Sequence, residues 1–228
     1  MPEPHRIDVT ATEQVTAIVY PAAPDDAADI SLILAHGAGA NQSSGFMVQF
    51  AAALAARGIE TITFNFVYSE TGRRLPDRND RLEACWRRVI AACRGGAIGG
   101  TGGRKVAIGG KSMGGRIASQ VAAADPDGIA GLVLLGYPLH PPGRPDQLRA
   151  EHLPGIRAPM LFVQGSRDAF GTPDELAPIM RSLEAPARLR VVEGGDHSFK
   201  VAKKAALSQE EVYEFVLDEI EQWLRALP

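Results

Sequence analysis

Ser112 is the residue whose neighbours most clearly suit it for chemistry. It lies at the centre of Gly110-Lys111-Ser112-Met113-Gly114, after a short apolar run and before residues with helical spacing. This G-x-S-x-G pattern between a strand and a helix is typical of a nucleophile elbow, a strained turn that exposes the serine hydroxyl at the edge of a sheet. Strand and helix crowd together in such a turn, so the positions two before and two after serine need glycine. In a chain with 24 glycines the pattern also fits an ordinary turn. Other residues that could act with Ser112 must therefore distinguish a catalytic serine from an ordinary one.

Two residues could activate Ser112, and each follows a predicted strand. Asp168 comes just after residues 160–165, and His197 comes just after residues 188–193. The carboxyl ends of parallel strands meet at one edge of a sheet, so we expect the three side chains to converge there. The chain order Ser, Asp, His fits a catalytic triad. We predict that His197 takes the serine proton as a general base and that Asp168 orients the imidazole.

Nucleophilic attack on a carbonyl group produces an oxyanion, which needs hydrogen-bond donors already in place. The backbone N–H of Met113 follows the serine at a predicted helix N-terminus and is one expected donor. A second glycine-rich segment, residues 36–39 with the sequence HGAG, follows the apolar run 30–35. It should reach the same edge of the sheet, and we expect it to supply the second donor.

Eight strand-like runs alternate with helical patterns along the chain. The expected strands are residues 6–10, 14–20, 30–35, 59–66, 106–109, 129–136, 160–165 and 188–193. Continuous apolar runs are typical of strands buried on both faces, and parallel neighbours are joined by right-handed crossovers. We therefore predict an α/β fold with an open, mostly parallel, twisted sheet of about eight strands, helices on both faces and a single domain over residues 1–228.

The connecting segments are expected to be irregular. Residues 67–77 are predicted to form a loop, and residues 95–103 a glycine-rich connector, which lacks the Lys-Ser/Thr of a phosphate-binding loop. Residues 137–159 are rich in proline and too few to form a large cap over the edge of the sheet. We expect the cleft to be open.

Composition excludes several classes of function. A net charge of −3 and a pI near 6.0 do not favour nucleic acid or an anionic membrane as a partner. No apolar run approaches the roughly 20 residues that span a bilayer. The N-terminal residues do not have the pattern of a secretory signal, so we expect a cytoplasmic location. Cys85 and Cys93 lie eight positions apart in one predicted helix, which favours neither a disulfide nor a metal site.

Taken together, the two glycine-rich motifs and the ordered Ser112, Asp168 and His197 resemble the α/β-hydrolase superfamily along nearly the whole chain. Within it, the chain is similar to small lidless hydrolases related to the dienelactone hydrolases. The dienelactone hydrolases proper have cysteine where this chain has Ser112, which favours ordinary ester chemistry here. The resemblance implies that the oxyanion hole is formed by the N–H groups of Ala38 and Met113, with Gly37 as the alternative to Ala38.

A pocket should lie beside these groups, near the strand ends. Gly37, Tyr68, Tyr137, Phe170 and Phe199 are the residues expected to bind substrate there, although each aromatic ring equally fits plain packing. Lys111 either attracts an anionic substrate or forms a structural ion pair away from the cleft, and the second interpretation is favoured.

The sequence thus predicts a serine hydrolase of the carboxylesterase type, class EC 3.1. It would act on carboxylic esters or related acyl compounds through an acyl-enzyme intermediate. The expected partner is a small-molecule acyl substrate, with no cofactor, no metal, no nucleic acid and no membrane, in a monomer or a homodimer. The alternative is a non-catalytic binding or scaffold protein that keeps the hydrolase fold.

Overall fold

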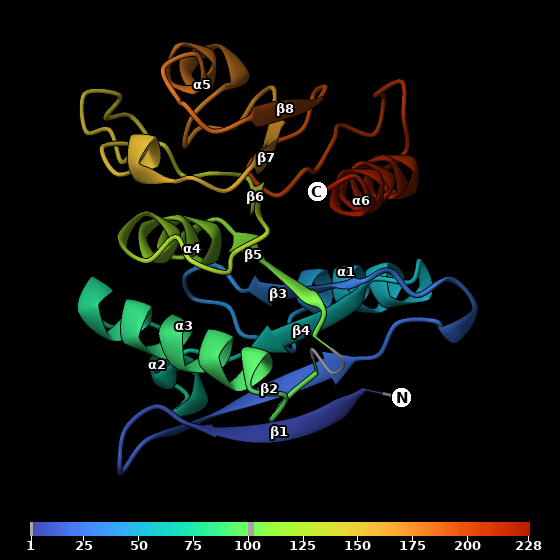
Figure 1. The fold of residues 1–228 in the computed structure, drawn as a ribbon. Helices are drawn as coiled ribbons and strands as arrows, with labels where there is room; N and C mark the ends of the chain where they lie inside the picture. Colours follow the sequence, from blue (N-terminus) through green and yellow to red (C-terminus); the bar gives the residue numbers. More distant parts are fainter. Residues whose placement is uncertain (1, 100–102) are drawn as a thin grey trace.

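The computed structural model describes residues 2–99 and 103–228 and contains an eight-stranded sheet with helices on both faces (Figure 1). The strands are β1 (Glu3–Asp8), β2 (Gln14–Tyr20), β3 (Ile30–Ala35), β4 (Glu60–Phe64), β5 (Lys105–Lys111), β6 (Gly131–Leu135), β7 (Met160–Gly165) and β8 (Ala187–Val192). They lie in the order β1-β2-β4-β3-β5-β6-β7-β8. β2 is antiparallel to β1 and β4, and the neighbours from β4 to β8 are parallel. The predicted open, mostly parallel sheet is confirmed.

The central strands are apolar because helices cover both of their faces. Every residue of β3, β6 and β7 is buried. Successive side chains of a strand point to opposite faces. Along β3, Ile33 and Ala35 pack into the hydrophobic core on one face of the sheet, while Leu32 and Leu34 pack into the core on the other. The sheet is therefore a rigid layer, from whose carboxyl edge the loops of the site project.

Helices cover the two faces unequally. The α-helices are α1 (Gly45–Ala56), α2 (Val67–Glu70), α3 (Asn79–Arg94), α4 (Met113–Ala124), α5 (Pro173–Met180) and α6 (Gln209–Arg225), and short 3-10 helices are η1 (Pro24–Asp26) and η2 (Leu153–Gly155). The apolar stripes of α1 and α6 share one hydrophobic core, and those of α3, α4 and α5 share the other. Figure 1 shows this division.

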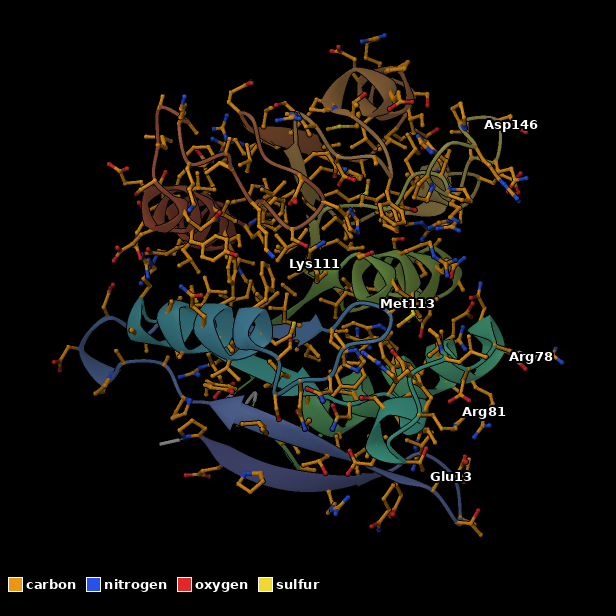
Figure 2. All side chains as sticks on the ribbon, turned by 180° about the vertical axis from the view of Figure 1, so that it is seen from behind. Glu13, Arg78, Arg81, Lys111, Met113 and Asp146 are labelled. Atoms are coloured by element: carbon orange, nitrogen blue, oxygen red, sulfur yellow. The ribbon has the colours of Figure 1, made fainter. Side chains whose placement is uncertain are left out.

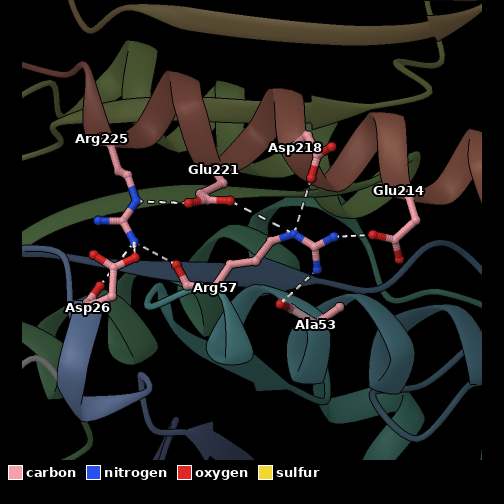
Figure 3. A network of polar contacts seen from close by, with 7 residues as sticks. All are labelled: Asp26, Ala53, Arg57, Glu214, Asp218, Glu221 and Arg225. Carbon is pink, nitrogen blue, oxygen red and sulfur yellow. Dashed lines mark hydrogen bonds and ion pairs between the residues drawn. The ribbon is translucent and has the colours of Figure 1, made fainter.

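A polar network on the surface ties the end of α1 to α6 (Figure 3). Arg57, just after α1, forms ion pairs with Glu214 and with Asp218, the latter at 3.3 Å. Arg225, near the end of α6, pairs with Asp26 at 2.6 Å and donates a hydrogen bond to the backbone oxygen of Arg57 at 2.7 Å. Exposed ion pairs each contribute little, but this network joins three segments that are distant in the sequence.

The sequence predictions of individual elements differ from the structure mainly at element ends. The strands at 14–20, 30–35 and 160–165 have the predicted bounds. β1 covers Glu3–Asp8 instead of residues 6–10, because the N–H groups of Val9 and Thr10 turn back to bond the oxygen of Glu13. The predicted loop at 67–77 begins with the short helix α2, and residues 100–102 of the predicted connector lie outside the described residues.

No large cap covers the carboxyl edge of the sheet in the described part of the chain. Residues 137–159 contain only η2 as regular structure. Among residues 2–99 and 103–228, no helix has both the length and the apolar character needed to cross a membrane. Cys85 and Cys93 are buried free thiols on α3.

Candidate active site

Ser112 occupies a strained turn between β5 and α4. Its backbone has φ 51° and ψ −117°, a left-handed conformation that is rare for residues other than glycine. A Cβ on Gly110 would lie 2.5 Å from the backbone oxygen of Ala35, and one on Gly114 would lie at the same distance from that oxygen. Both distances are far below van der Waals contact. Glycine is therefore required at both positions, as the sequence predicted.

The side chains of Ser112, His197 and Asp168 meet at the carboxyl edge of the sheet. The Nε2 atom of His197 lies 2.8 Å from the Oγ atom of Ser112, and its Nδ1 atom lies 3.0 and 2.8 Å from the two oxygens of Asp168. A carboxylate only accepts hydrogen bonds, so Nδ1 carries the proton and Nε2 is left as an acceptor for the serine hydroxyl. This arrangement suits a general base.

Asp168 is held by further donors in a site closed to solvent. Its side chain is 0% exposed, whereas that of His197 is 21% exposed. The N–H of Phe170 donates to one carboxylate oxygen at 2.8 Å, and Nε2 of Gln164 donates to the other at 2.8 Å. A buried carboxylate requires such partners, because an unpaired charge in the protein interior is costly.

Gln164 is a residue of the site that the sequence analysis missed. It lies in β7, is fully buried, and its amide also donates to the backbone oxygen of Gly171 at 2.7 Å. Its Oε1 accepts from the N–H of Tyr137 at 2.8 Å. One side chain thereby fixes the Asp168 loop and the segment after β6. A glutamine inside an otherwise apolar strand is the signal that could have identified it, since buried amides need specific partners.

The candidate oxyanion donors have no other acceptor. Within residues 2–99 and 103–228, no acceptor is bonded to the N–H of Met113, at the start of α4, to that of Ala38, or to that of Gly37, the alternative to Ala38. The 36–39 segment lies against the nucleophile: a Cβ on Gly37 would lie 3.6 Å from the Cβ of Ser112. Both predicted donors therefore lie on segments that border Ser112.

The side chain of His36 connects the 36–39 segment to Phe66. It is fully buried, and burial lowers its pKa to about 4, so the ring is neutral at pH 7. Nδ1 lies 2.9 Å from the oxygen of Gly37, and Nε2 lies 3.4 Å from the N–H nitrogen of Phe66. A neutral imidazole satisfies both contacts by donating from Nδ1 and accepting at Nε2.

A cavity of about 750 Å³ opens beside Ser112 and His197. Of the predicted substrate-binding residues, Gly37 and Phe170 line it, and the Phe170 ring stacks on that of His197 with centroids 4.1 Å apart. Phe46, Met47 and Tyr213 also line it. These three come from the starts of α1 and α6, which the sequence analysis did not assign to the site.

Tyr68, Tyr137 and Phe199 do not line this cavity, contrary to the sequence-based expectation. Each is almost completely buried. Tyr68 packs beside His36 in the layer beneath the 36–39 segment, and the hydroxyl of Tyr137 donates to a backbone oxygen at 2.7 Å. Phe199 belongs to the core beneath α1 and α6. The sequence correctly predicted that these three residues lie near strand ends. It did not predict that their side chains point into the core instead of the cavity.

Lys111 precedes the nucleophile and lies near the centre of the molecule, as does Met113 on its other side (Figure 2). It lines the cavity and is 9% exposed, yet its Nζ atom is buried and has no hydrogen-bond partner in the described residues. The favoured interpretation of Lys111, an ion pair away from the cleft, is not what the structure shows. Burial lowers the pKa of Lys111 to about 8, although Asp168 and Asp196 partly oppose this effect. The ammonium group therefore stays largely charged at pH 7.

Metal ligation has no visible basis in this site. In the described ranges, no three His, Cys, Asp or Glu side chains gather in a way that could hold a metal ion.

The sequence matches the family model of the alpha/beta hydrolase domain over residues 28–225. This match includes all three converging side chains and nearly the whole chain. The chain therefore belongs to the alpha/beta hydrolase family.

Solved structures with the same fold include lidless hydrolases. A lidless α/β serine hydrolase from Xanthomonas campestris is 20% identical, with a TM-score of 0.76 over 100% of this chain and 97% of that one. A dienelactone hydrolase from Anabaena variabilis is 20% identical, with a TM-score of 0.74 over 99% and 98%. Est1E from Butyrivibrio proteoclasticus is 14% identical, with a TM-score of 0.70 over 95% and 98%. These identities are low, and the likenesses show the shared fold.

Proposed function

We propose that this protein is a serine hydrolase that cleaves carboxylic esters through Ser112, His197 and Asp168. The observation that carries the proposal is the pair of short contacts to His197, at 2.8 Å from the Ser112 hydroxyl and 2.8 Å from Asp168. The three residues come from three loops separated by more than 80 positions of chain at the widest, 112 to 197. Their convergence in the order required for proton transfer favours catalysis over packing.

The reaction follows from these positions. The Ser112 oxygen attacks the ester carbonyl carbon while its proton passes to Nε2 of His197. The carbonyl oxygen becomes an oxyanion that the N–H groups of Met113 and Ala38 stabilise. The tetrahedral intermediate collapses, and the alcohol leaves with the proton from His197. Water then attacks the acyl-enzyme, returns a proton through His197 and releases the carboxylic acid, which regenerates Ser112.

Two features favour small ester substrates, within class EC 3.1. The nucleophile is a serine, for which acyl transfer from oxygen esters is the ordinary reaction. Residues 137–159 form no large cap, so the cavity is reached directly from solvent and need not enclose a long lipid chain. No cofactor enters any step.

Labelling with a fluorophosphonate probe tests the proposal. We expect the probe to modify Ser112, detected by mass spectrometry of the labelled peptide, and Ser112→Ala to lose both labelling and the hydrolysis of 4-nitrophenyl butyrate. Loss of the triad serine lowers turnover by about 10⁶-fold in a well-studied protease.

Ser119 offers a matched control within the same helix. Its Oγ atom lies 2.7 Å from Nε2 of His152, so a second serine–histidine contact exists in the molecule. Ser119 is fully buried and lies six residues after Met113 along α4. Ser119→Ala should keep the label on position 112. If folded protein takes no label at Ser112, the alternative of a non-catalytic binding or scaffold protein is favoured instead. The cytoplasmic location and the monomeric or homodimeric state remain predictions.

A further inference from the structure

The cavity beside Ser112 is rich in cations although the chain as a whole carries a net charge of −3. Its described lining includes Lys111, Arg116, Arg149 and Lys200 but a single carboxylate, that of Asp77. Charges that line a concave site of low dielectric focus the electrostatic potential there. Positive side chains thus outnumber negative ones in the cavity lining, whereas the whole chain has a net negative charge.

Asp77 does not neutralise these cations, because its charge is already matched elsewhere. Its side chain is 5% exposed and pairs with Arg73 at 2.9 Å. It also lies 3.5 Å from Arg81, on the first turn of α3, which itself pairs with Glu13 (Figure 2). Arg73 and Arg81 therefore balance the charges of Asp77 and Glu13.

Arg116 and Arg149 form no ion pair within the described residues. Arg116, on α4, donates to the neutral Oδ1 of Asn79 at 3.3 Å. Burial, and then the charge of Arg149, lower the pKa of Arg116, while Tyr137 and Glu83 partly oppose this effect. Glu83 is itself paired with Arg87 at 2.8 Å. Two guanidinium groups that repel one another in the lining of one cavity are a site that an anion would stabilise.

The backbone of Arg149 is held by two hydrogen bonds. Its N–H donates to the oxygen of Leu139 at 2.8 Å, and its own oxygen accepts from the hydroxyl of Tyr137 at 2.7 Å. The backbone of Arg116 belongs to α4, the helix that begins just after Ser112. The backbone positions from which both side chains extend are therefore defined by the fold.

The cavity lining also has an aromatic part. Phe46 stacks on Phe50 with centroids 4.0 Å apart, and Tyr213 meets Phe46 edge-on at 6.2 Å. These rings belong to α1 and α6, whereas Arg116 belongs to α4 on the other face of the sheet. Aromatic and cationic side chains thus line one cavity together with Ser112.

We propose that Arg116 and Arg149 form a subsite for a carboxylate, so that the preferred substrate is an ester that also carries a free carboxylate group. This inference rests on the proposed ester hydrolysis at Ser112 and adds the class of ester. Guanidinium groups suit the subsite because their planar donor fork matches the two oxygens of a carboxylate. The buried ammonium of Lys111 adds to the positive potential without touching the substrate.

A matched pair of substrates tests the inference. The 4-nitrophenyl ester of adipic acid carries one free carboxylate, and the same ester with that carboxylate methylated is neutral and of similar size. We expect the ratio of kcat/KM for the anionic ester to that for the neutral one to be about 10 or more at low ionic strength, the size expected for a charge-assisted contact. The ratio should fall as salt is added, because salt screens exposed charges.

Variants identify the residues responsible. Arg116→Gln and Arg149→Gln should each lower the ratio severalfold, mainly through the KM of the anionic ester. Arg144→Gln is the control, since Arg144 is exposed, lies five positions before Arg149 and is not part of the cavity lining. A parent enzyme that hydrolyses both esters with equal kcat/KM overturns the inference and leaves the proposed function intact.

A binding measurement keeps the two proposals separate if no ester is hydrolysed. Absence of both hydrolysis and fluorophosphonate labelling refutes the proposed function. Titration of monomethyl adipate and of dimethyl adipate, followed by ligand-observed NMR, then tests the subsite alone. Tighter binding of the anion that is lost in both arginine variants supports it, and equal or undetectable binding of the two ligands refutes it.

Discussion

Replacement of Lys111 with methionine should stabilise the protein at neutral pH. The Nζ atom is buried without a hydrogen-bond partner in the described residues, although it lies 5.8 Å from the centre of the Phe199 ring. A charge in such a place loses its hydration and regains little. Methionine is similar in length, has no charge and can fill the same irregular space. Lys111→Met therefore removes the cost of the charge while leaving most of the packing.

The magnitude follows from the displacement of the pKa. Burial takes the pKa of Lys111 from 10.5 to about 8. Each pKa unit corresponds to about 1.4 kcal/mol, so the charged form costs about 3 kcal/mol. Between pH 8 and 10.5 the unfolded chain binds this proton and the folded protein does not, so stability of the parent rises with pH in this window. The advantage of Lys111→Met should thus be about 3 kcal/mol at pH 7 and shrink toward zero near pH 10.5.

Urea unfolding at pH 7, 9 and 10.5, followed by circular dichroism, measures this difference. Lys105→Met is the matched control, because Lys105 begins the same strand but is exposed. It should change stability by less than about 0.5 kcal/mol at every pH. A Lys111→Met protein that is less stable than the parent at pH 7, or whose advantage does not change with pH, would refute the reasoning. Either result would mean that the ammonium has a stabilising partner in solution.

Three further outcomes are expected. Gly114→Ala should prevent folding or lower the melting temperature strongly, because its Cβ would lie 2.5 Å from the last carbonyl oxygen of β3, whereas Gly45→Ala, with no atom within 4 Å, should not. Gln164→Leu should destabilise the protein by about 1–3 kcal/mol in chemical denaturation and lower kcat, since it removes a donor from Asp168. Acidification from pH 6.5 to 4 should lower the free energy of unfolding by up to about 3 kcal/mol through His36. In this range the unfolded chain binds a proton on His36, whereas the folded protein, in which the pKa of His36 is about 4, does not. His36→Gln should reduce this acid sensitivity.

The sheet and its loops were predictable because local sequence carries the necessary signals. Apolar runs predicted β3 and β7 with correct bounds, and Gly110 and Gly114 indicated the turn at Ser112. The helix that begins at Gln209 starts with a capping box, in which Ser208 accepts from the N–H of Glu211. Loops that follow parallel strands must share one edge, so the presence of Ser112, Asp168 and His197 at one edge of the sheet followed from topology.

The lining of the cavity was less predictable, because it depends on which way loops turn after leaving the sheet. Tyr68, Phe170 and Phe199 follow the ends of β4, β7 and β8 by four, five and seven residues, yet only Phe170 of the three lines the cavity. Phe199 has φ 59°, a backbone conformation that its own residue type does not favour and that no local pattern indicates. The contribution of Phe46 was hidden for a different reason, since it is set by the packing of α1 against α6.

One buried amide couples Asp168, the carboxylate of the proposed triad, to the part of the cavity lining that is proposed to bind substrate. Gln164 donates to Asp168 at 2.8 Å and accepts from the N–H of Tyr137 at 2.8 Å. The hydroxyl of Tyr137 in turn donates to the backbone oxygen of Arg149. Residues 137–159 therefore contact both groups. Tyr137, at the start of this segment, is bonded to Gln164, and Arg149, in its middle, lines the cavity. Because Tyr137 is bonded to Gln164 through its backbone and to Arg149 through its hydroxyl, a change at Gln164 should alter the KM for the carboxylate-bearing ester as well as kcat, whereas a change at Arg149 should alter KM alone.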